Sequence, residues 1–213
     1  MATTLAPAAS RPRNTIRAAE RSAFKLLNRC MVPALRAGLA PFFGSPFTGY
    51  FLLLRTTGRK TGLPRYSPLN YALRDGCVYV LAGFGEGTHW LANLRDDSRV
   101  RIRLPACESD GTAEVVVGPR EATHMAVAVA RNSGIALLFE HPHCLFMTGA
   151  QLARRLEGRP VVRICPDGAP VQTGSFDPGG RGWLLTIGVQ VAALALVWSR
   201  LSRRSRARDG ELL

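Results

Sequence analysis

The residues best suited to chemistry lie in one short segment, where three cations stand beside two glycines. The segment, Thr56-Thr57-Gly58-Arg59-Lys60-Thr61-Gly62-Leu63-Pro64-Arg65, lies between two apolar runs. Its glycines allow a tight turn whose backbone can approach a ligand closely. Its guanidinium and ammonium groups, together with the N–H groups of the turn, could hold an anion, and phosphate is the anion we expect.

The commonest phosphate-binding motif does not explain this segment. Lys60-Thr61 matches the end of G-x-x-x-x-G-K-[ST], but Arg59 occupies the place of the glycine before the lysine. The flanks predict strand-turn-strand, whereas that motif needs strand-turn-helix. Because basic residues at a hairpin tip also occur in plain solvated turns, the choice between the two interpretations depends on the sequence downstream.

Several downstream blocks support the binding interpretation. The ordered blocks are the segment at residues 56–65, Pro68-Leu69, Val80-Leu81-Ala82-Gly83, His89-Trp90-Leu91-Ala92-Asn93-Leu94 and Arg99-Val100. Together they resemble the deazaflavin-dependent nitroreductase family, also called the F420H2-dependent quinone reductase family. The resemblance covers about residues 24 to 166.

The resemblance implies a split β-barrel that binds the reduced 8-hydroxy-5-deazaflavin F420, with the basic loop on the cofactor phosphate. The implied cofactor-binding residues are Arg59, Lys60, Thr61, Arg65, Ser67, Pro68, Leu69, Ala82, Gly83, Trp90 and Asn93. It also implies hydride transfer to a quinone-like or other lipophilic acceptor. The cofactor carries the hydride chemistry, so no catalytic side chain is assigned. Candidates for a proton to the acceptor are Ser67, Tyr71 and His89.

Two features depart from the family pattern, and two alternatives stay open. The chain has no tyrosine after Tyr79, and Phe84-Gly85-Glu86 stands where relatives often carry a lysine.

One alternative is an FMN-binding split barrel related to pyridoxamine phosphate oxidases. The other is a non-catalytic, membrane-attached barrel that binds a lipid or fatty acyl ligand.

Composition predicts one basic domain with an anionic partner. The chain has 213 residues, 46% of them hydrophobic, and a formal net charge of +13. Much of this charge lies near the two ends, where residues 11–29 hold six basic residues against one acidic residue and residues 199–213 hold five against two. No helix-turn-helix, zinc finger or RNA-binding motif accompanies the charge, so we do not expect a nucleic-acid partner.

The five cysteines predict neither a disulfide framework nor a metal site. They are widely spaced and form no C-x-x-C pair, which favours reduced thiols in a cytosolic setting. The one metal-like cluster is His141-Pro142-His143-Cys144. Because it has an internal proline and no matching second half, we predict a loop and no metal.

Hydrophobic periodicity predicts an α+β fold that is mainly β, an antiparallel barrel with flanking helices, and the family resemblance implies that this barrel is a split barrel. Expected strands cover 51–54, 67–73, 78–82, 100–104, 112–117 and 160–165, with a turn at Ser109-Asp110-Gly111, and expected helical regions cover 89–94 and 121–158. The predicted segments are a disordered leader (1–13), an N-terminal amphipathic helix (14–45), the barrel domain (46–166), a linker (167–181), a membrane helix (182–199) and a basic tail (200–213).

The C-terminal segment predicts a single transmembrane helix. Gly182 to Trp198 holds no charge, carries Trp183 and Trp198 at its ends, and includes only Thr186 and Gln190 as sizeable polar side chains. At 1.5 Å per residue it is about 26 Å long, which just suffices for the hydrocarbon layer. The arginines that follow favour a cytoplasmic tail. Free thiols and a cytosolic electron donor favour a cytoplasmic domain, which is our expectation.

Overall fold

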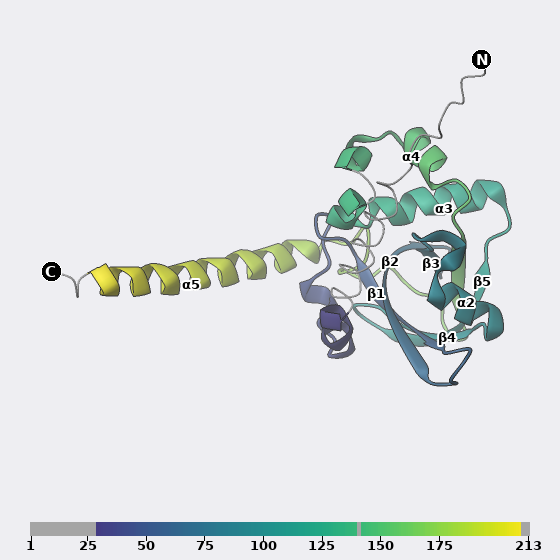
Figure 1. Cartoon of the computed structure of the whole chain (residues 1–213), viewed down its shortest axis with the longest axis horizontal. Helices are drawn as coiled ribbons and strands as arrows, with labels where there is room; N and C mark the ends of the chain where they lie inside the picture. Colours follow the sequence, from purple (N-terminus) through teal and green to yellow (C-terminus); the bar gives the residue numbers. More distant parts are fainter. Residues whose placement is uncertain (1–28, 140–141, 210–213) are drawn as a thin grey trace, which may run out of the picture.

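The computed structural model describes residues 29–139 and 142–209, and within them six antiparallel strands close into a barrel (Figure 1). The strand order around the barrel is β1-β2-β3-β6-β5-β4. The strands are β1 (Phe51–Thr57), β2 (Pro64–Arg74), β3 (Cys77–Leu81), β4 (Arg99–Arg103), β5 (Glu108–Val115) and β6 (Val161–Pro166). The predicted mainly β barrel with flanking helices is confirmed. The predicted leader, and residues 14–28 of the predicted N-terminal helix, lie outside the described residues.

Alternating side chains of the strands fill the barrel. Leu52 and Leu54 of β1, Val78 and Val80 of β3, and Ile164 of β6 are fully buried. The helix α2 (His89–Asp96) adds Trp90, Leu91 and Leu94 to this same core. Burial of this apolar surface is the main force that closes the barrel and seats α2 against it.

The outer face of the barrel is covered by two further helices. These are α3 (Pro119–Arg131), which begins with a proline in its first turn, and α4 (Gly149–Leu156), which Thr148 and Gln151 cap reciprocally. Their apolar faces form a second core with Tyr79 of β3 and Val161 of β6. Short 3₁₀ turns, η3 (Gly134–Phe139) and η4 (Pro142–Phe146), connect the two helices.

The turn predicted at Ser109-Asp110-Gly111 is wrong, because these residues belong to strand β5. Gly111 pairs with Val100 and Pro166 in the neighbouring strands. A Cβ on Gly111 would come within 2.5 Å of the Cys165 carbonyl oxygen. The glycine therefore serves the close approach of two strands and does not mark a turn.

Residues after β6 fold back onto the barrel before the C-terminal helix begins. Asp177 is buried and accepts a hydrogen bond of 2.5 Å from the hydroxyl of Tyr71. It also accepts one of 2.7 Å from the backbone N–H of Gly174. Burial, followed by the charge of Asp177, raises the pKa of Tyr71 far above its ordinary value. Tyr71 thus fastens this segment and stays protonated.

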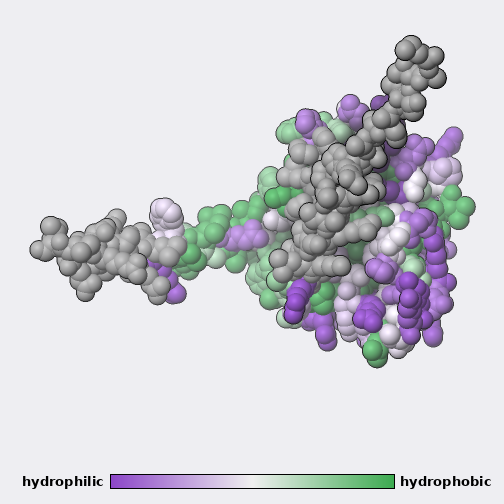
Figure 2. All heavy atoms as spheres, in the orientation of Figure 1, coloured by the Kyte–Doolittle hydropathy of each residue, from purple (hydrophilic) through white to green (hydrophobic). Residues whose placement is uncertain are grey.

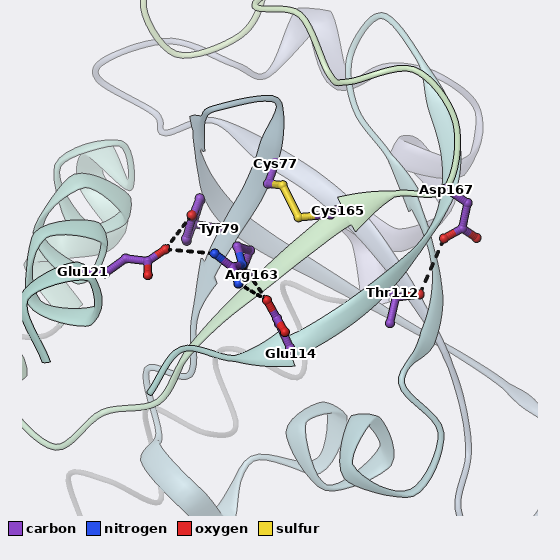
Figure 3. The surroundings of a disulfide bond; sticks show 8 residues. All are labelled: Cys77, Tyr79, Thr112, Glu114, Glu121, Arg163, Cys165 and Asp167. Atoms are coloured by element: carbon purple, nitrogen blue, oxygen red, sulfur yellow. Dashed lines mark hydrogen bonds and ion pairs between the residues drawn. A yellow bond between two sulfur atoms is a disulfide. The ribbon is translucent and has the colours of Figure 1, made fainter. Parts of the chain in front are cut away.

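The expectation of five reduced cysteines is wrong, because Cys77 and Cys165 form a disulfide (Figure 3). They lie 88 residues apart in the sequence, but the antiparallel register of β3 and β6 places them opposite each other with Cα atoms 4.5 Å apart. Sequence spacing cannot show such a cross-strand pair. Cys30 and Cys107 are exposed free thiols, and Cys144 is a buried one.

Loss of this disulfide should destabilise the barrel. We expect Cys77→Ser with Cys165→Ser to lower the free energy of unfolding by about 2 kcal/mol, since the bridge restricts the unfolded chain. Urea unfolding of the full chain in mild detergent, followed by tryptophan fluorescence, measures the change. The control is Cys30→Ser with Cys107→Ser, which should leave the unfolding midpoint in place. Equal midpoints for all three proteins would contradict the expectation.

The C-terminal helix α5 (Trp183–Asp209) leaves the barrel as a single rod (Figure 1). Its apolar part, Trp183–Arg200, has 18 residues and a mean hydropathy of 1.4, and only 6% of it is buried. By length and composition this part could cross a membrane. The predicted C-terminal apolar helix is therefore confirmed.

Candidate anion and cofactor site

The basic segment forms the turn between β1 and β2. The backbone N–H of Gly58 donates to the Leu63 carbonyl at 2.9 Å, and the N–H groups of Thr61 and Gly62 donate back to the Gly58 carbonyl. Gly62 has a φ of +66°, which favours glycine. A Cβ on Gly58 would lie 3.0 Å from the Leu63 carbonyl oxygen, so a larger residue would push the turn apart. Local backbone geometry thus favours glycine at both positions, through the positive φ of Gly62 and the tight space beside Gly58.

Asn93 of α2 locks this turn against the barrel. Its side-chain oxygen accepts hydrogen bonds of 3.3 Å from both the backbone N–H and the guanidinium of Arg59. Its amide nitrogen donates to the hydroxyl of Thr56 at 3.2 Å. Asn93 and Thr56 are both buried. The first cation of the turn is therefore held in place by a residue 34 positions away in the sequence.

A cavity of about 450 Å³ lies between the turn and α2. The predicted site residues that line it are Arg59, Lys60, Thr61, Arg65, Ser67, Trp90 and Asn93. Gly58, Tyr66 and His89 complete the lining. The structure thus brings seven of the eleven predicted residues to one hollow.

The cations of this cavity have no carboxylate partner among the residues that the structure describes. Within residues 29–139 and 142–209, none of the ion pairs involves Arg59, Lys60 or Arg65. All three are exposed, and Arg65 donates to the hydroxyl of Thr61 at 3.4 Å. The turn therefore presents uncompensated positive charge at the edge of the cavity, which suits an anionic ligand.

Four predicted residues do not line the cavity. Leu69 packs against the barrel core, and Ala82 is fully buried within it. The carbonyl of Gly83 accepts a hydrogen bond of 2.9 Å from the guanidinium of Arg159. Pro68 pairs with Leu53 within the sheet. Pro68 faces the opposite side of β2 from Arg65 and Ser67, whereas Leu69 lies on their side but farther along the strand, and Ala82 and Gly83 follow the end of β3.

Glu86, the acidic residue shortly after Gly83, is neutralised by an ion pair. The carboxylate of Glu86 lies 2.6 Å from the guanidinium of Arg95 in α2. The hydrogen bond from Arg95 lowers the pKa of Glu86. Glu86 consequently stays ionised and paired with Arg95, and neither residue lines the cavity.

Three residues of the lining were not predicted as cofactor-binding residues. These are Gly58, Tyr66 and His89, of which His89 alone was named as a candidate proton donor. Tyr66 directly follows Arg65, so its place beside the predicted cations was the available signal. The Arg36 guanidinium lies 4.8 Å from the centre of the Tyr66 ring. Of the three proton-donor candidates, His89 and Ser67 line the cavity, whereas Tyr71 lies in the barrel core bonded to Asp177.

A second basic hollow adjoins the first across Tyr66. It has a volume of about 240 Å³ and is lined by Arg36, Leu53, Arg55, Tyr66, Arg101, Arg103 and Glu108. Arg103 pairs with Glu108, while Arg101 binds both carboxylate oxygens of Asp110 at 2.7 Å. Two of the four arginines in this hollow are therefore already neutralised, unlike the cations of the turn.

The residues predicted as metal-like do not form a cluster in the described part of the chain. His141 lies outside the described residues, and Cys144 is buried in the core between α3 and α4. Among residues 29–139 and 142–209, no group of three or more histidine, cysteine or acidic side chains could hold a metal ion.

Comparison with known proteins gives one family. The family model described as F420H(2)-dependent quinone reductase matches residues 29–136, just over half of the chain. The matched region contains the turn, α2 and every residue that lines the 450 Å³ cavity.

Solved structures show weaker similarity. A conserved hypothetical protein from Mycobacterium tuberculosis is 23% identical, with a TM-score of 0.42 over 62% of this chain and 80% of that one. The F420-H2 dependent reductase FDR-A is 24% identical, with a TM-score of 0.37 over 54% of this chain and 92% of that one. The heme storage protein HutZ from Vibrio cholerae is 16% identical, with a TM-score of 0.37 over 56% and 82%.

Proposed function

Since the chain belongs to the F420H2-dependent quinone reductase family, we propose that the cavity beside the β1–β2 turn binds F420 and that a quinone-like lipophilic acceptor is reduced there. The observation that carries this proposal is a set of three cations on one turn that have no carboxylate partner in the described part of the chain. Membership of the family makes the protein an F420-dependent oxidoreductase. The residues in contact with the cofactor, the acceptor and the membrane location are the parts that we propose.

The residues present fit the cofactor. F420 carries a phosphodiester, and Lys60 and Arg65 can approach it from the exposed side of the turn while Asn93 holds Arg59. Gly58 has no Cβ, which would be in tight contact with the Leu63 carbonyl oxygen, and its backbone is therefore open to a ligand. The rings of Trp90 and Tyr66 offer flat apolar walls for a planar heterocycle.

When bound, the reduced deazaflavin supplies a hydride from its C5 carbon. The protein would hold the ring and the acceptor in contact, which can contribute a large part of the rate by orientation alone. Trp90 would exclude water on the α2 side. Ser67 or His89 would donate a proton to the reduced acceptor, since both side chains line the same cavity.

Titration of the purified full chain in mild detergent tests the cofactor. We expect F420 to change the fluorescence of Trp90 with saturation in the micromolar range or below, and FMN to bind at least about tenfold more weakly, a difference of about 1.4 kcal/mol. Tighter binding of FMN would favour the pyridoxamine phosphate oxidase alternative. Binding of neither flavin would leave the barrel as a lipid or fatty acyl carrier and would overturn the proposal.

We propose further that α5 anchors the domain to a membrane, where a lipophilic acceptor is concentrated. The exposed apolar stretch Trp183–Arg200 supports this anchor. On a density gradient, the full chain should float with lipid vesicles and stay bound in alkaline carbonate. A chain truncated after Gly182 should remain at the bottom, and flotation of that truncated chain would assign attachment to the domain instead.

We propose that the domain lies on the cytoplasmic side, because the reaction needs reduced F420 and this electron donor is cytosolic. Two observations oppose this side. Two of the five cysteines form a disulfide, and the arginines after the span favour a cytoplasmic tail, which a single span would place opposite the domain. A membrane-impermeant maleimide added to intact cells decides the matter through the exposed Cys107. We expect labelling only after lysis, and labelling of intact cells would place the domain outside.

A further inference from the structure

The first turns of α5 are bound to the short 3₁₀ turn η1 (Ala40–Phe42). The hydroxyl of Thr186 donates to the Pro41 carbonyl at 2.6 Å, and the side-chain amide of Gln190 donates to the Phe42 carbonyl at 3.0 Å. Thr186 and Gln190 are the two sizeable polar side chains between Trp183 and Trp198. Both polar groups of the apolar span are thus satisfied by η1, which ties this turn to the helix.

The length of the span fixes where a bilayer would begin. Arg181 is exposed just before it and Arg200 ends it, which leaves 18 residues, or about 27 Å, for a hydrocarbon layer of about 30 Å. There is no spare length, so the layer has to begin close to Trp183. Gln190 lies seven residues later, about 10 Å deeper along the helix axis. The bonded carbonyls of η1 therefore lie between the headgroup–acyl boundary and about 10 Å below it, the depth that interfacial apolar groups reach.

The surface around η1 is apolar. Four large apolar residues, which we call the collar, are exposed to water here: Leu39, Phe42, Phe43 and Phe47. The ring of Phe47 packs edge-on against Trp183 with centroids 6.3 Å apart, which joins the collar to the start of the span. In Figure 2 the hydrophobic colour of α5 continues onto the face of the domain from which the helix leaves.

We propose that the collar is a membrane-docking surface, whose occupant is the interfacial layer of the leaflet that α5 enters. This inference rests on the proposed membrane attachment and goes beyond it, since an anchor alone would let the domain swing freely. The collar adjoins the start of the span through the contact of Phe47 with Trp183, which favours lipid as the occupant. Any other partner would have to bind at a depth that the bilayer already occupies. Interfacial lipid also suits phenylalanine rings that are half exposed in water.

Docking through the collar would give the domain one orientation. The end of α3 lies beside the collar, since the N–H of Ile135 donates to the Phe47 carbonyl at 2.6 Å and that of Tyr50 donates to the Asn132 carbonyl at 2.9 Å. From there α3 runs back for 13 residues, about 20 Å, to its start at Pro119. Figure 1 shows α3 nearly parallel to α5, so this start points away from the leaflet.

Two matched positions test the proposal. Phe47 and Val117 are both exposed apolar residues, at 68% and 92%, and they lie at the collar and just before the distant start of α3. Each is changed to cysteine, Phe47→Cys or Val117→Cys, in a full chain with Cys30→Ser and Cys107→Ser. Each protein is labelled with an environment-sensitive fluorophore. It is then inserted into phosphatidylcholine vesicles that contain some phosphatidylglycerol and doxyl-labelled lipid.

We expect the label at position 47 to shift to the blue and to be quenched several-fold more than the label at position 117. Leu39→Cys provides a second collar position if Phe47→Cys does not fold. Flotation of the same samples separates the two proposals. If the proteins do not float, the anchor fails and the collar with it. If they float and both labels remain equally exposed to water, the collar inference is overturned and the anchor stands.

Discussion

Replacing Lys60 and Arg65 together by alanine is expected to weaken F420 binding to the purified protein by about 100-fold or more. Each cation would make charge-assisted hydrogen bonds to the phosphodiester, and each such bond contributes about 1.5–3 kcal/mol. The two losses together reach about 3 kcal/mol, which corresponds to a factor of roughly 100 in the dissociation constant. Tryptophan fluorescence titration at fixed ionic strength measures the change.

A matched control separates contact from long-range charge. Arg120→Ala with Arg154→Ala removes the same number of cations from exposed positions on α3 and α4, outside the cavity. This control should bind F420 nearly as tightly as the natural sequence. An equal loss in both double variants would mean that only the overall charge matters. Unchanged binding by the Lys60 and Arg65 variant would remove the turn from the cofactor site.

Asn93→Ala is expected to weaken F420 binding by about tenfold or more and to lower the free energy of unfolding by about 1–3 kcal/mol. The change removes hydrogen bonds to Arg59 and to the buried hydroxyl of Thr56, which then lacks this partner. The turn would no longer be held in one arrangement, so part of the binding energy would be spent on ordering it. Urea unfolding and fluorescence titration measure the two effects.

Asn132→Ala distinguishes positioning from general stability. The side chain of Asn132 donates a hydrogen bond of 3.0 Å to the Tyr71 carbonyl, at a distance from the cavity lining. This variant should lose comparable stability and keep its affinity for F420. If Asn93→Ala and Asn132→Ala lose affinity in parallel, Asn93 acts only through the stability of the fold. Faster amide exchange at the turn in Asn93→Ala alone would support its positioning role.

Local sequence signals predicted the parts of the site that depend on neighbours along the chain. The glycine spacing predicted the turn, and alternating apolar residues predicted the strands that carry it. The absence of charge between Gly182 and Trp198 predicted the C-terminal apolar helix. These signals act over a few residues, because backbone conformation and the periodicity of burial are short-range properties.

Tertiary structure decided which distant residues meet. Asn93 reaches Arg59 across 34 residues, Tyr71 reaches Asp177 across 106, and Cys77 pairs with Cys165 across 88. Each contact depends on how β-strands pair in register and on how the barrel closes, and a single sequence does not encode either in any local pattern. For the same reason Ala82 and Gly83, which the sequence predicted as cofactor-binding residues, lie outside the cavity.

The sequence by itself determined the chemical character of this protein: a glycine-flanked group of cations, a barrel-forming pattern and an apolar C-terminal segment. The tertiary structure decided that these cations line a cavity without carboxylate partners in the described residues, that two cysteines are joined, and that η1 accepts hydrogen bonds from Thr186 and Gln190 of α5. The physical reason is the distance along the chain over which each kind of interaction acts. Propensity and charge are properties of a segment, whereas a site is a set of distances that exists only once the strands have paired and the core has closed.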